Sequence, residues 1–302
     1  MATLYTQSES NTRKTFLLIT VFLIFIIALG WLFSYLTGDS VYLVGAVILS
    51  TVQSFVSYWY SDKIVLGMNK AVEIKHEENP DLYHIVENLC IAAGLPTPKI
   101  YIIDELQPNA FATGRDKNHA TIAVTRGLLE KLNRSELEGV IAHELSHVGN
   151  KDILLSTAVV VLVGIIALLS NWFLRISFWG GGRRRDSRDS GNAGAILAVL
   201  GIAAAILAPI AATLIQLAIS RKREFLADAD GALLTRYPEG LASALEKIAH
   251  DPNPLRAASS SNAHLYIENP FRGEENRSFL VKLFSTHPPV EERIKMLRGM
   301  SV

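Results

Sequence analysis

Long runs of uncharged, mostly apolar residues divide this chain of 302 residues, and they cover positions 15–38, 40–61, 153–174 and 193–220. An α-helix needs roughly 20 apolar residues to cross the hydrocarbon core of a bilayer, which is about 30 Å thick. Each run is long enough, so the pattern predicts four membrane helices. Asp39 is the only charged residue between the first two runs, which predicts a tight helical hairpin.

The first run shares some features with a secretory signal peptide. Arg13 and Lys14 precede it, and residues 28–30 (Ala-Leu-Gly) resemble a cleavage site. The apolar positions nevertheless continue from Trp31 to Leu36, beyond that point. We therefore expect a retained membrane anchor.

The distribution of Lys and Arg in the short loops predicts the orientation of these helices. Two basic residues precede the first run, Lys63 and Lys70 follow the second, and the turn at 37–40 has neither Lys nor Arg. Because basic loops stay in the cytoplasm, the amino terminus and residues 62–152 are expected there. This orientation implies a multi-pass protein of the cell membrane.

The arginine-rich loop at 175–192 opposes this assignment, because four full spans would place it outside the cell. Either Asp186 and Asp189 reduce the cost, or the third and fourth runs form a hairpin that does not cross fully. Both alternatives leave the polar segments on the cytoplasmic side.

Shorter periodic segments between and after the runs predict an α+β arrangement that is mainly helical and carries a small β-sheet. The expected division is 1–61, a membrane hairpin; 62–152, the first polar part; 153–220, a second hairpin; and 221–302, the second polar part. Helices are expected at 80–93, 126–132, 135–149, near 217–235, near 238–250 and at 289–298. Strands are expected at 99–103, 109–114 and 120–125, and the last two flank a polar turn at 115–119, which predicts a β-hairpin. A loop is expected at 251–263.

Composition narrows the function classes. The chain is 49% hydrophobic and has a formal net charge of zero. It has no basic stripe with interleaved aromatic residues, so nucleic acid is not expected as a partner. Cys90 is the only cysteine, which excludes an internal disulfide and fits a reducing compartment.

Residues 143–147 read His-Glu-Leu-Ser-His, in a segment with helical periodicity. Positions four apart lie on one face of a helix, so His143 and His147 can bind one Zn²⁺ ion. Glu144 can take a proton from a metal-bound water, as in the HExxH pattern of zinc peptidases. We expect Ser135 and Glu138 to form a capping box that begins this helix. The alternative is a surface helix with solvated histidines.

A catalytic zinc typically has three protein ligands and one water. Glu224 is the best candidate for the third ligand, because it lies in a second helical segment that follows the fourth run. Asp228 lies one turn later and can accept a hydrogen bond from the far nitrogen of a ligating histidine. The alternative for both is a solvated helix face that pairs with Arg221 and Lys222.

With these residues, the chain resembles the HtpX family of membrane-bound zinc metalloproteases, which act in bacterial heat-shock quality control. The motifs that carry the resemblance are Asn109–Arg115, His143–His147 with Asn150–Asp152, Arg223–Asp228, and Phe284–Pro289 with Glu292–Ile294. The resemblance implies one zinc ion per chain, a zincin-like cytoplasmic catalytic domain, and cleavage of misfolded or membrane proteins. It also implies His143, His147 and Glu224 as ligands and Glu144 as the base.

Two further groups are candidates for binding the substrate. His287 and Arg293 can donate to the oxyanion of the tetrahedral intermediate, although His287 can instead cap a helix and Arg293 can pair with a nearby acid. The segment Asn109, Ala110, Phe111 and Ala112 can be a sheet edge that a substrate extends as an added strand, or an ordinary edge strand.

Three other functions compete with that of a membrane-surface protease. An intramembrane protease is disfavoured, because charged residues such as Arg134 and Lys151 flank residues 143–147. A transporter is disfavoured, because the four runs carry no ionisable residue. A non-catalytic membrane scaffold with a structural metal site stays open, since His119, His264 or His287 could be a fourth ligand.

Overall fold

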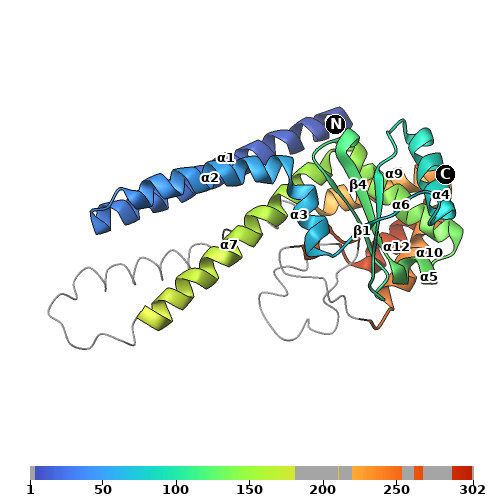
Figure 1. The fold of residues 1–302 in the computed structure, drawn as a ribbon. Coiled ribbons are helices and arrows are strands. Elements are labelled where there is room, and N and C mark those ends of the chain that lie inside the picture. The colour runs from blue at the N-terminus through green and yellow to red at the C-terminus, as the bar shows by residue number, and fades with distance from the viewer. Residues whose placement is uncertain (1–3, 181–209, 211–219, 254–261, 268–287, 301–302) are drawn as a thin grey trace.

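The computed structural model describes residues 4–180, 210, 220–253, 262–267 and 288–300. Within this part the protein is mainly helical with one small mixed sheet, which confirms the predicted α+β character. Two long helices, α1 (Leu4–Thr37) and α2 (Val41–Trp59), run side by side as a hairpin away from the polar part, and α7 (Asp152–Gly180) extends in the same direction (Figure 1).

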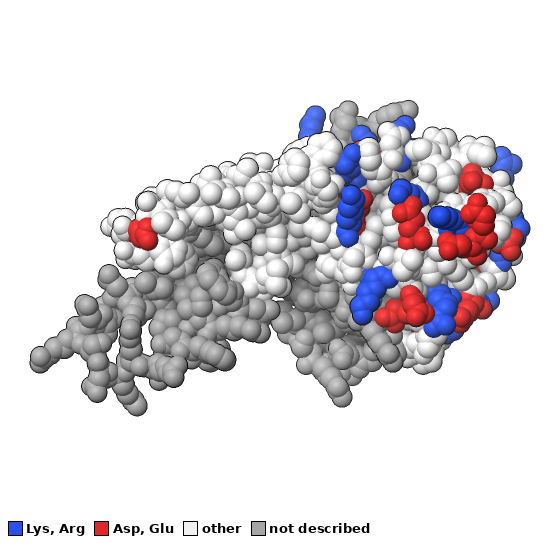
Figure 2. All heavy atoms as spheres, in the orientation of Figure 1, with Lys and Arg blue, Asp and Glu red and all other residues white. Residues whose placement is uncertain are grey.

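Three segments of the described residues are long and apolar enough to cross a membrane: Ser10–Thr37, Val41–Trp59 and Asp152–Ser170. They correspond to the first three predicted runs. The fourth run, 193–220, lies outside the described residues except for positions 210 and 220. The arginine-rich loop was expected to begin at 175, but α7 continues to Gly180, and the rest of that loop lies outside the described residues. Many large apolar side chains on α1 and α2 are exposed, such as Leu17 and Ile48. Figure 2 shows that charged side chains gather on the polar part and are sparse on the projecting helices.

The sheet has four strands in the order β1-β2-β4-β3: β1 is Val72–Glu73, β2 is Lys99–Ile103, β3 is Ala110–Gly114 and β4 is Ala120–Thr125. Strands β2 and β4 are parallel, whereas β3 pairs with β4 in antiparallel register, with Phe111 opposite Ala123. The predicted hairpin of β3 and β4 is therefore confirmed, and β3 is an edge strand of the sheet that the described residues form. A 3₁₀ turn, Lys117–His119, joins these two strands.

Both faces of this sheet are covered, which explains why every residue of β3 and β4 is buried. Alternate residues such as Ile100 and Ile122 pack into the main core with α4 (Pro80–Ala93), α6 (Arg134–Gly149) and α10 (Pro238–Ala249). The opposite face, including Phe111, packs against α3 (Ser61–Met68), α7 and Tyr266. The sheet thus links α6, which carries the HExxH segment, to α7, a candidate membrane span.

The HExxH segment lies on α6, but the predicted capping box is wrong. Asn133 is the N-cap residue and accepts from the backbone N–H of Glu136 at 3.0 Å, while Glu136 accepts from the N–H of Asn133 at 2.8 Å. The sequence offers an acidic residue three positions after both Asn133 and Ser135, and the tertiary structure decides between them. Ser243 and Lys247 of α10 hold the Glu136 carboxylate at 2.6 and 2.7 Å.

Helix α6 lies in close contact with α9 (Arg221–Thr235) and α10. A Cβ atom on Gly231 of α9 would lie 3.1 Å from the backbone nitrogen of His143. Likewise, a Cβ on Gly139 would lie 2.7 Å from the nitrogen of Leu241. Glycine at these positions lets the helices approach closely, which brings the two halves of the predicted site together.

The remaining predicted elements also lie in the polar part. Helices α4 and α10 match their expected ranges to within one residue, α5 is Arg126–Lys131, and α12 is Val290–Arg298. The expected start of the next helix, near 217, lies outside the described residues, and α9 is described from Arg221. The expected loop at 251–263 is described only at its two ends, 251–253 and 262–263. A 3₁₀ turn, Ala263–Leu265, begins at its second end.

Candidate metal centre

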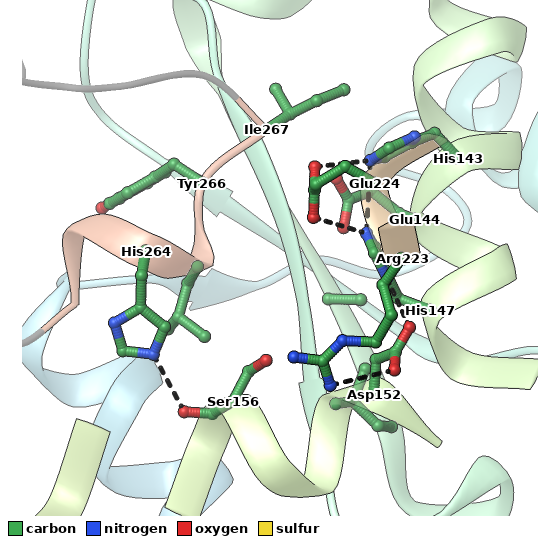
Figure 3. Close-up of a pocket in the computed structure, with 13 residues that line it drawn as sticks. His143, Glu144, His147, Asp152, Ser156, Arg223, Glu224, His264, Tyr266 and Ile267 are labelled. Atoms are coloured by element: carbon green, nitrogen blue, oxygen red, sulfur yellow. Dashed lines mark hydrogen bonds and ion pairs between the residues drawn. The ribbon is translucent and has the colours of Figure 1, made fainter. Parts of the chain in front are cut away.

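The structure brings together the three side chains that the sequence singles out as metal ligands. The Nε2 atoms of His143 and His147 lie 3.2 Å apart, and those nitrogens lie 3.8 and 3.7 Å from the carboxylate oxygens of Glu224. His143 and Glu224 are buried, and the His147 side chain is 17% exposed. Helices α6 and α9, separated by more than 70 residues of sequence, thus direct their ligand atoms to one point (Figure 3).

This donor set fits Zn²⁺. Ligands about 2.0–2.1 Å from a tetrahedral zinc lie roughly 3.3 Å from one another. One ligand atom from each of the three residues falls within 4.8 Å of the others, so a small closure of Glu224 would complete such a geometry. Two imidazoles and one carboxylate are also the ligand types of many catalytic zinc sites.

The far nitrogen of His143 has a carboxylate partner, as predicted for Asp228. Nδ1 of His143 lies 3.0 Å from Oδ1 of Asp228, and both side chains are buried. Burial alone would raise the pKa of Asp228, but the Arg293 guanidinium outweighs it and holds that pKa at about 2. Asp228 therefore stays ionised and can accept the Nδ1–H of His143, an arrangement that leaves Nε2 available to a metal.

The far nitrogen of His147 has a partner to which sequence reasoning assigned no role. Nδ1 of His147 lies 3.0 Å from Oδ2 of Asp152, the first residue of α7. Burial disfavours the protonated imidazole, but hydrogen bonding to Asp152 and the charge of Glu224 raise the pKa of His147 to about 9. The sequence feature that could have indicated this partner is the position of Asp152, which follows His147 by five residues and directly precedes the third apolar run.

Glu144 is buried beside the three candidate ligands. Burial raises its pKa, and the nearby imidazoles of His143 and His147 partly offset this effect. Its carboxylate also accepts a hydrogen bond from the backbone of Ala112 in β3. The edge strand thus holds the predicted base in place.

A small cavity lies against these residues. Its walls are formed by α6 and Glu224 on one side and by His264, Tyr266 and Ile267 on the other (Figure 3). The backbone N–H of Ile267 donates to the carbonyl of Ala110 at 3.1 Å. The segment at 262–267 therefore lies along part of the outer edge of β3.

The other predicted site residues are placed as follows. Arg293 of α12 is fully buried and donates to both oxygens of Asp228 and to the carbonyl of Ile267. The edge segment from Asn109 to Ala112 is buried, but only Ala112 lines the cavity, because Phe111 points to the opposite face and packs edge-on against Tyr266. His287 lies outside the described residues.

Long apolar helices joined to a His-His-Glu group with a buried acidic neighbour are typical of a membrane-associated metallopeptidase. The sequence model of Peptidase family M48 matches residues 76–301. The chain is 48% identical over 303 residues to a Protease HtpX homolog of Caldanaerobacter subterraneus, with 99% of each chain covered. It therefore belongs to peptidase family M48 and, within it, to the HtpX proteases.

Other similar proteins extend this comparison. A Protease HtpX homolog of Tropheryma whipplei is 48% identical over 297 residues, with 98% of each chain covered. Among solved structures, the crystal structure of S. mikatae Ste24p aligns with a TM-score of 0.49 at 19% identity, covering 97% of this chain and 66% of that one.

Proposed function

We propose that this protein is a zinc-dependent endopeptidase of the cell membrane that cleaves misfolded or membrane proteins at the cytoplasmic face. The observation that carries the proposal is the convergence of His143, His147 and Glu224, with ligand atoms within 4.8 Å of one another. The described residues give three such ligands, which suits a catalytic site with a position free for water. This count disfavours the alternative of a closed structural site in a non-catalytic scaffold.

The mechanism follows from the placement of these residues. When bound, zinc supplies a Lewis acid and a water of lowered pKa. Glu144 takes the proton of the attacking water and later delivers it to the leaving amine. Its burial favours this role, because a carboxylate of raised pKa both accepts and returns a proton readily. Asp228 and Asp152 keep His143 and His147 in their ligating tautomers.

The contacts of Arg293 favour an orienting role over direct contact with the substrate. Its Nε, Nη1 and Nη2 atoms already donate to Asp228 and to the carbonyl of Ile267. We therefore assign Arg293 to the support of His143. His287 stays the candidate donor to the oxyanion.

Strand β3 is the proposed docking edge for an extended substrate, because it is the sheet edge beside the cavity. Main-chain pairing would recognise any extended segment with little side-chain selectivity, which suits a quality-control protease. Since Ile267 pairs with Ala110 at this edge, a substrate would pair beyond Ala110 or displace the segment at 262–267.

The membrane topology is part of the same proposal. We assign residues 1–61 and 153–220 to membrane hairpins and residues 62–152 and 221–302 to one cytoplasmic catalytic domain. The sparse charge on the projecting helices supports this division (Figure 2). Lys63 and Lys70, which follow α2, support the cytoplasmic placement of the polar part.

The test is to purify the full chain in detergent and to measure bound zinc and cleavage of casein with and without a chelator. We expect about one zinc per chain, loss of cleavage with the chelator, and recovery when zinc is restored. A protein that binds no metal, or that cleaves equally well without it, would overturn the proposal.

A further inference from the structure

A polar residue of the first membrane helix is buried next to the metal centre. Asn11 lies in the candidate span Ser10–Thr37 of α1 and is only 3% exposed. A buried amide is costly unless its donors and acceptor are hydrogen-bonded. The next question is therefore which groups bond to the amide of Asn11.

Those partners lie at the end of α6 and at the starts of α7 and α9. Nδ2 of Asn11 donates to Oδ1 of Asp152 at 2.6 Å and to the carbonyl of Asn150 at 3.3 Å. Oδ1 of Asn11 accepts from Nη1 of Arg223 at 3.3 Å. Asn11 thus connects α1 to the two helices that begin beside the metal ligands.

The contacts form a chain that ends on a ligand. Asp152 uses one oxygen for Asn11 and the other for Nδ1 of His147, at 3.0 Å. A carboxylate held on one oxygen by an outside donor keeps its other oxygen aimed in one direction. Asn11 therefore acts on the orientation of His147 through Asp152, without touching the ligand.

Arg223 joins the same cluster from α9. Its Nη1 lies 3.4 Å from Oδ1 of Asp152, and Arg223 immediately precedes the ligand Glu224. The cluster of Asn11, Asp152 and Arg223, each 9% exposed or less, therefore contacts both helices that supply ligands. The packing of Phe22 and Ile26 of α1 against α7 holds Asn11 in this position.

We propose that Asn11 is a positioning residue of the metal centre, so that the first membrane helix completes the support of His147. This inference rests on the proposed function, because it concerns the same metal site. It assigns α1 a role beyond anchoring: detachment of its cytoplasmic end would loosen the centre.

The experiment compares Asn11→Ala and Asn11→Asp with the wild-type chain, each full length and in detergent. Thr15→Val is the matched control, because Thr15 is also buried on α1, one turn further along, and its hydroxyl donates only to the Asn11 carbonyl. Metal affinity is measured by competition of Zn²⁺ with a chromophoric chelator. The visible spectrum of the Co²⁺-loaded protein reports the ligand geometry, and thermal unfolding of the metal-stripped protein reports folding.

We expect Asn11→Ala to lower zinc affinity about tenfold, at the lower end of the range for outer partners of metal ligands, with an altered Co²⁺ spectrum. Asn11→Asp, which keeps the side-chain shape but removes the donor to Asp152, should lower affinity at least as much. Thr15→Val should keep wild-type affinity and spectrum. In an Asp152→Asn background, Asn11→Ala should add little, because the two residues act in series.

The outcomes separate the inference from the proposed function. Wild-type affinity and an unchanged spectrum in both Asn11 variants would overturn the inference alone. A lower unfolding temperature of the metal-stripped variants with wild-type affinity would also overturn it, because the role would then be only structural. Failure of the wild-type chain to bind zinc, or unaltered binding in His143→Ala, would instead overturn the proposed function. If Asn11→Ala does not fold, Asn11→Asp alone decides.

Discussion

Arg293 donates two hydrogen bonds to the carboxylate of Asp228, from Nε to Oδ2 at 2.8 Å and from Nη2 to Oδ1 at 2.6 Å. Both side chains are buried, at 0% and 1% exposed. The same Oδ1 lies 3.0 Å from Nδ1 of His143. The last helix, α12, thus reaches the candidate metal centre through one carboxylate.

Substitution of Arg293 should lower the folding stability far more than substitution of a surface arginine. Arg293→Ala leaves Asp228 as an uncompensated buried charge, which costs about 3–5 kcal/mol of folding free energy. Arg298→Ala on the same helix is the control, because Arg298 pairs with Glu239 and Glu246 at the surface. Thermal and denaturant unfolding in detergent measure both variants. Equal stability of the two would contradict the assigned role of the Arg293–Asp228 pair.

Substitutions of the proposed base, Glu144, and of the proposed third ligand, Glu224, should affect zinc binding differently. We expect Glu144→Gln to keep zinc but lose proteolysis, because the amide cannot accept the water proton. Glu224→Ala should release zinc as well, since it removes a ligand. Metal content and peptide cleavage are measured for each. Full activity of Glu144→Gln would exclude the mechanism, and undiminished zinc in Glu224→Ala would exclude the ligand set.

Gly231 should tolerate no large side chain. Its Cβ position lies 3.1 and 3.3 Å from the backbone N and Cα of His143, so Gly231→Ala must push α9 away by a few tenths of an ångström. Gly231→Val should cost about 1–3 kcal/mol by overpacking and weaken zinc binding, because Glu224 lies on the same helix.

Gly67 is the control position for the Gly231 substitutions, because it is a helical glycine with open space around it. It lies on α3, and a Cβ there meets no atom within 4 Å. Gly67→Ala should be neutral or stabilise by roughly 0.5–1 kcal/mol, since alanine is the better helix former. Zinc titration and unfolding of the Gly231 and Gly67 variants decide whether the close approach matters.

The start of α6 depends on Asn133. Asn133→Ala should lower the free energy of unfolding by about 1 kcal/mol, because it removes the side-chain acceptor at the N-cap. Ser135→Ala should have a smaller effect, since its hydroxyl donates only to Asn133 at the surface. Denaturant unfolding of the two variants, side by side, measures the difference. A larger loss in Ser135→Ala would restore the cap that the sequence favoured.

Cys90 should make the folded protein sensitive to alkaline pH. Burial raises its pKa from 9.0 to about 11, with a contribution from Glu87. Between these values the native thiol keeps its proton while the unfolded thiol loses it, so stability falls as pH rises from about 9 to about 11. Cys90→Ala should show a shallower decline in unfolding temperature over that range. An identical decline in both proteins would refute the effect.

The local sequence pattern was sufficient to predict many of the helices, strands and candidate site residues of this protein. Apolar run length predicted the helices α1, α2 and α7, because crossing or covering an apolar layer requires that length whatever the neighbours. Two strand-like segments on either side of a polar turn predicted the pairing of β3 with β4, and the spacing of His143 and His147 predicted a shared helical face. Glu224 and Asp228 could be selected because the chemistry of zinc demands a third ligand and an oriented histidine.

Other features were decided only by the tertiary structure. The choice of Asn133 over Ser135 depends on where α10 holds Glu136, and the role of Arg293 depends on α12 packing beside Asp228. The sequence assigned no role to Asp152 or to Asn11, and 141 positions separate them in the chain. Only the packing of α1 against α7 brings them together. Partners of buried polar groups are set by long-range packing, which a local pattern does not encode.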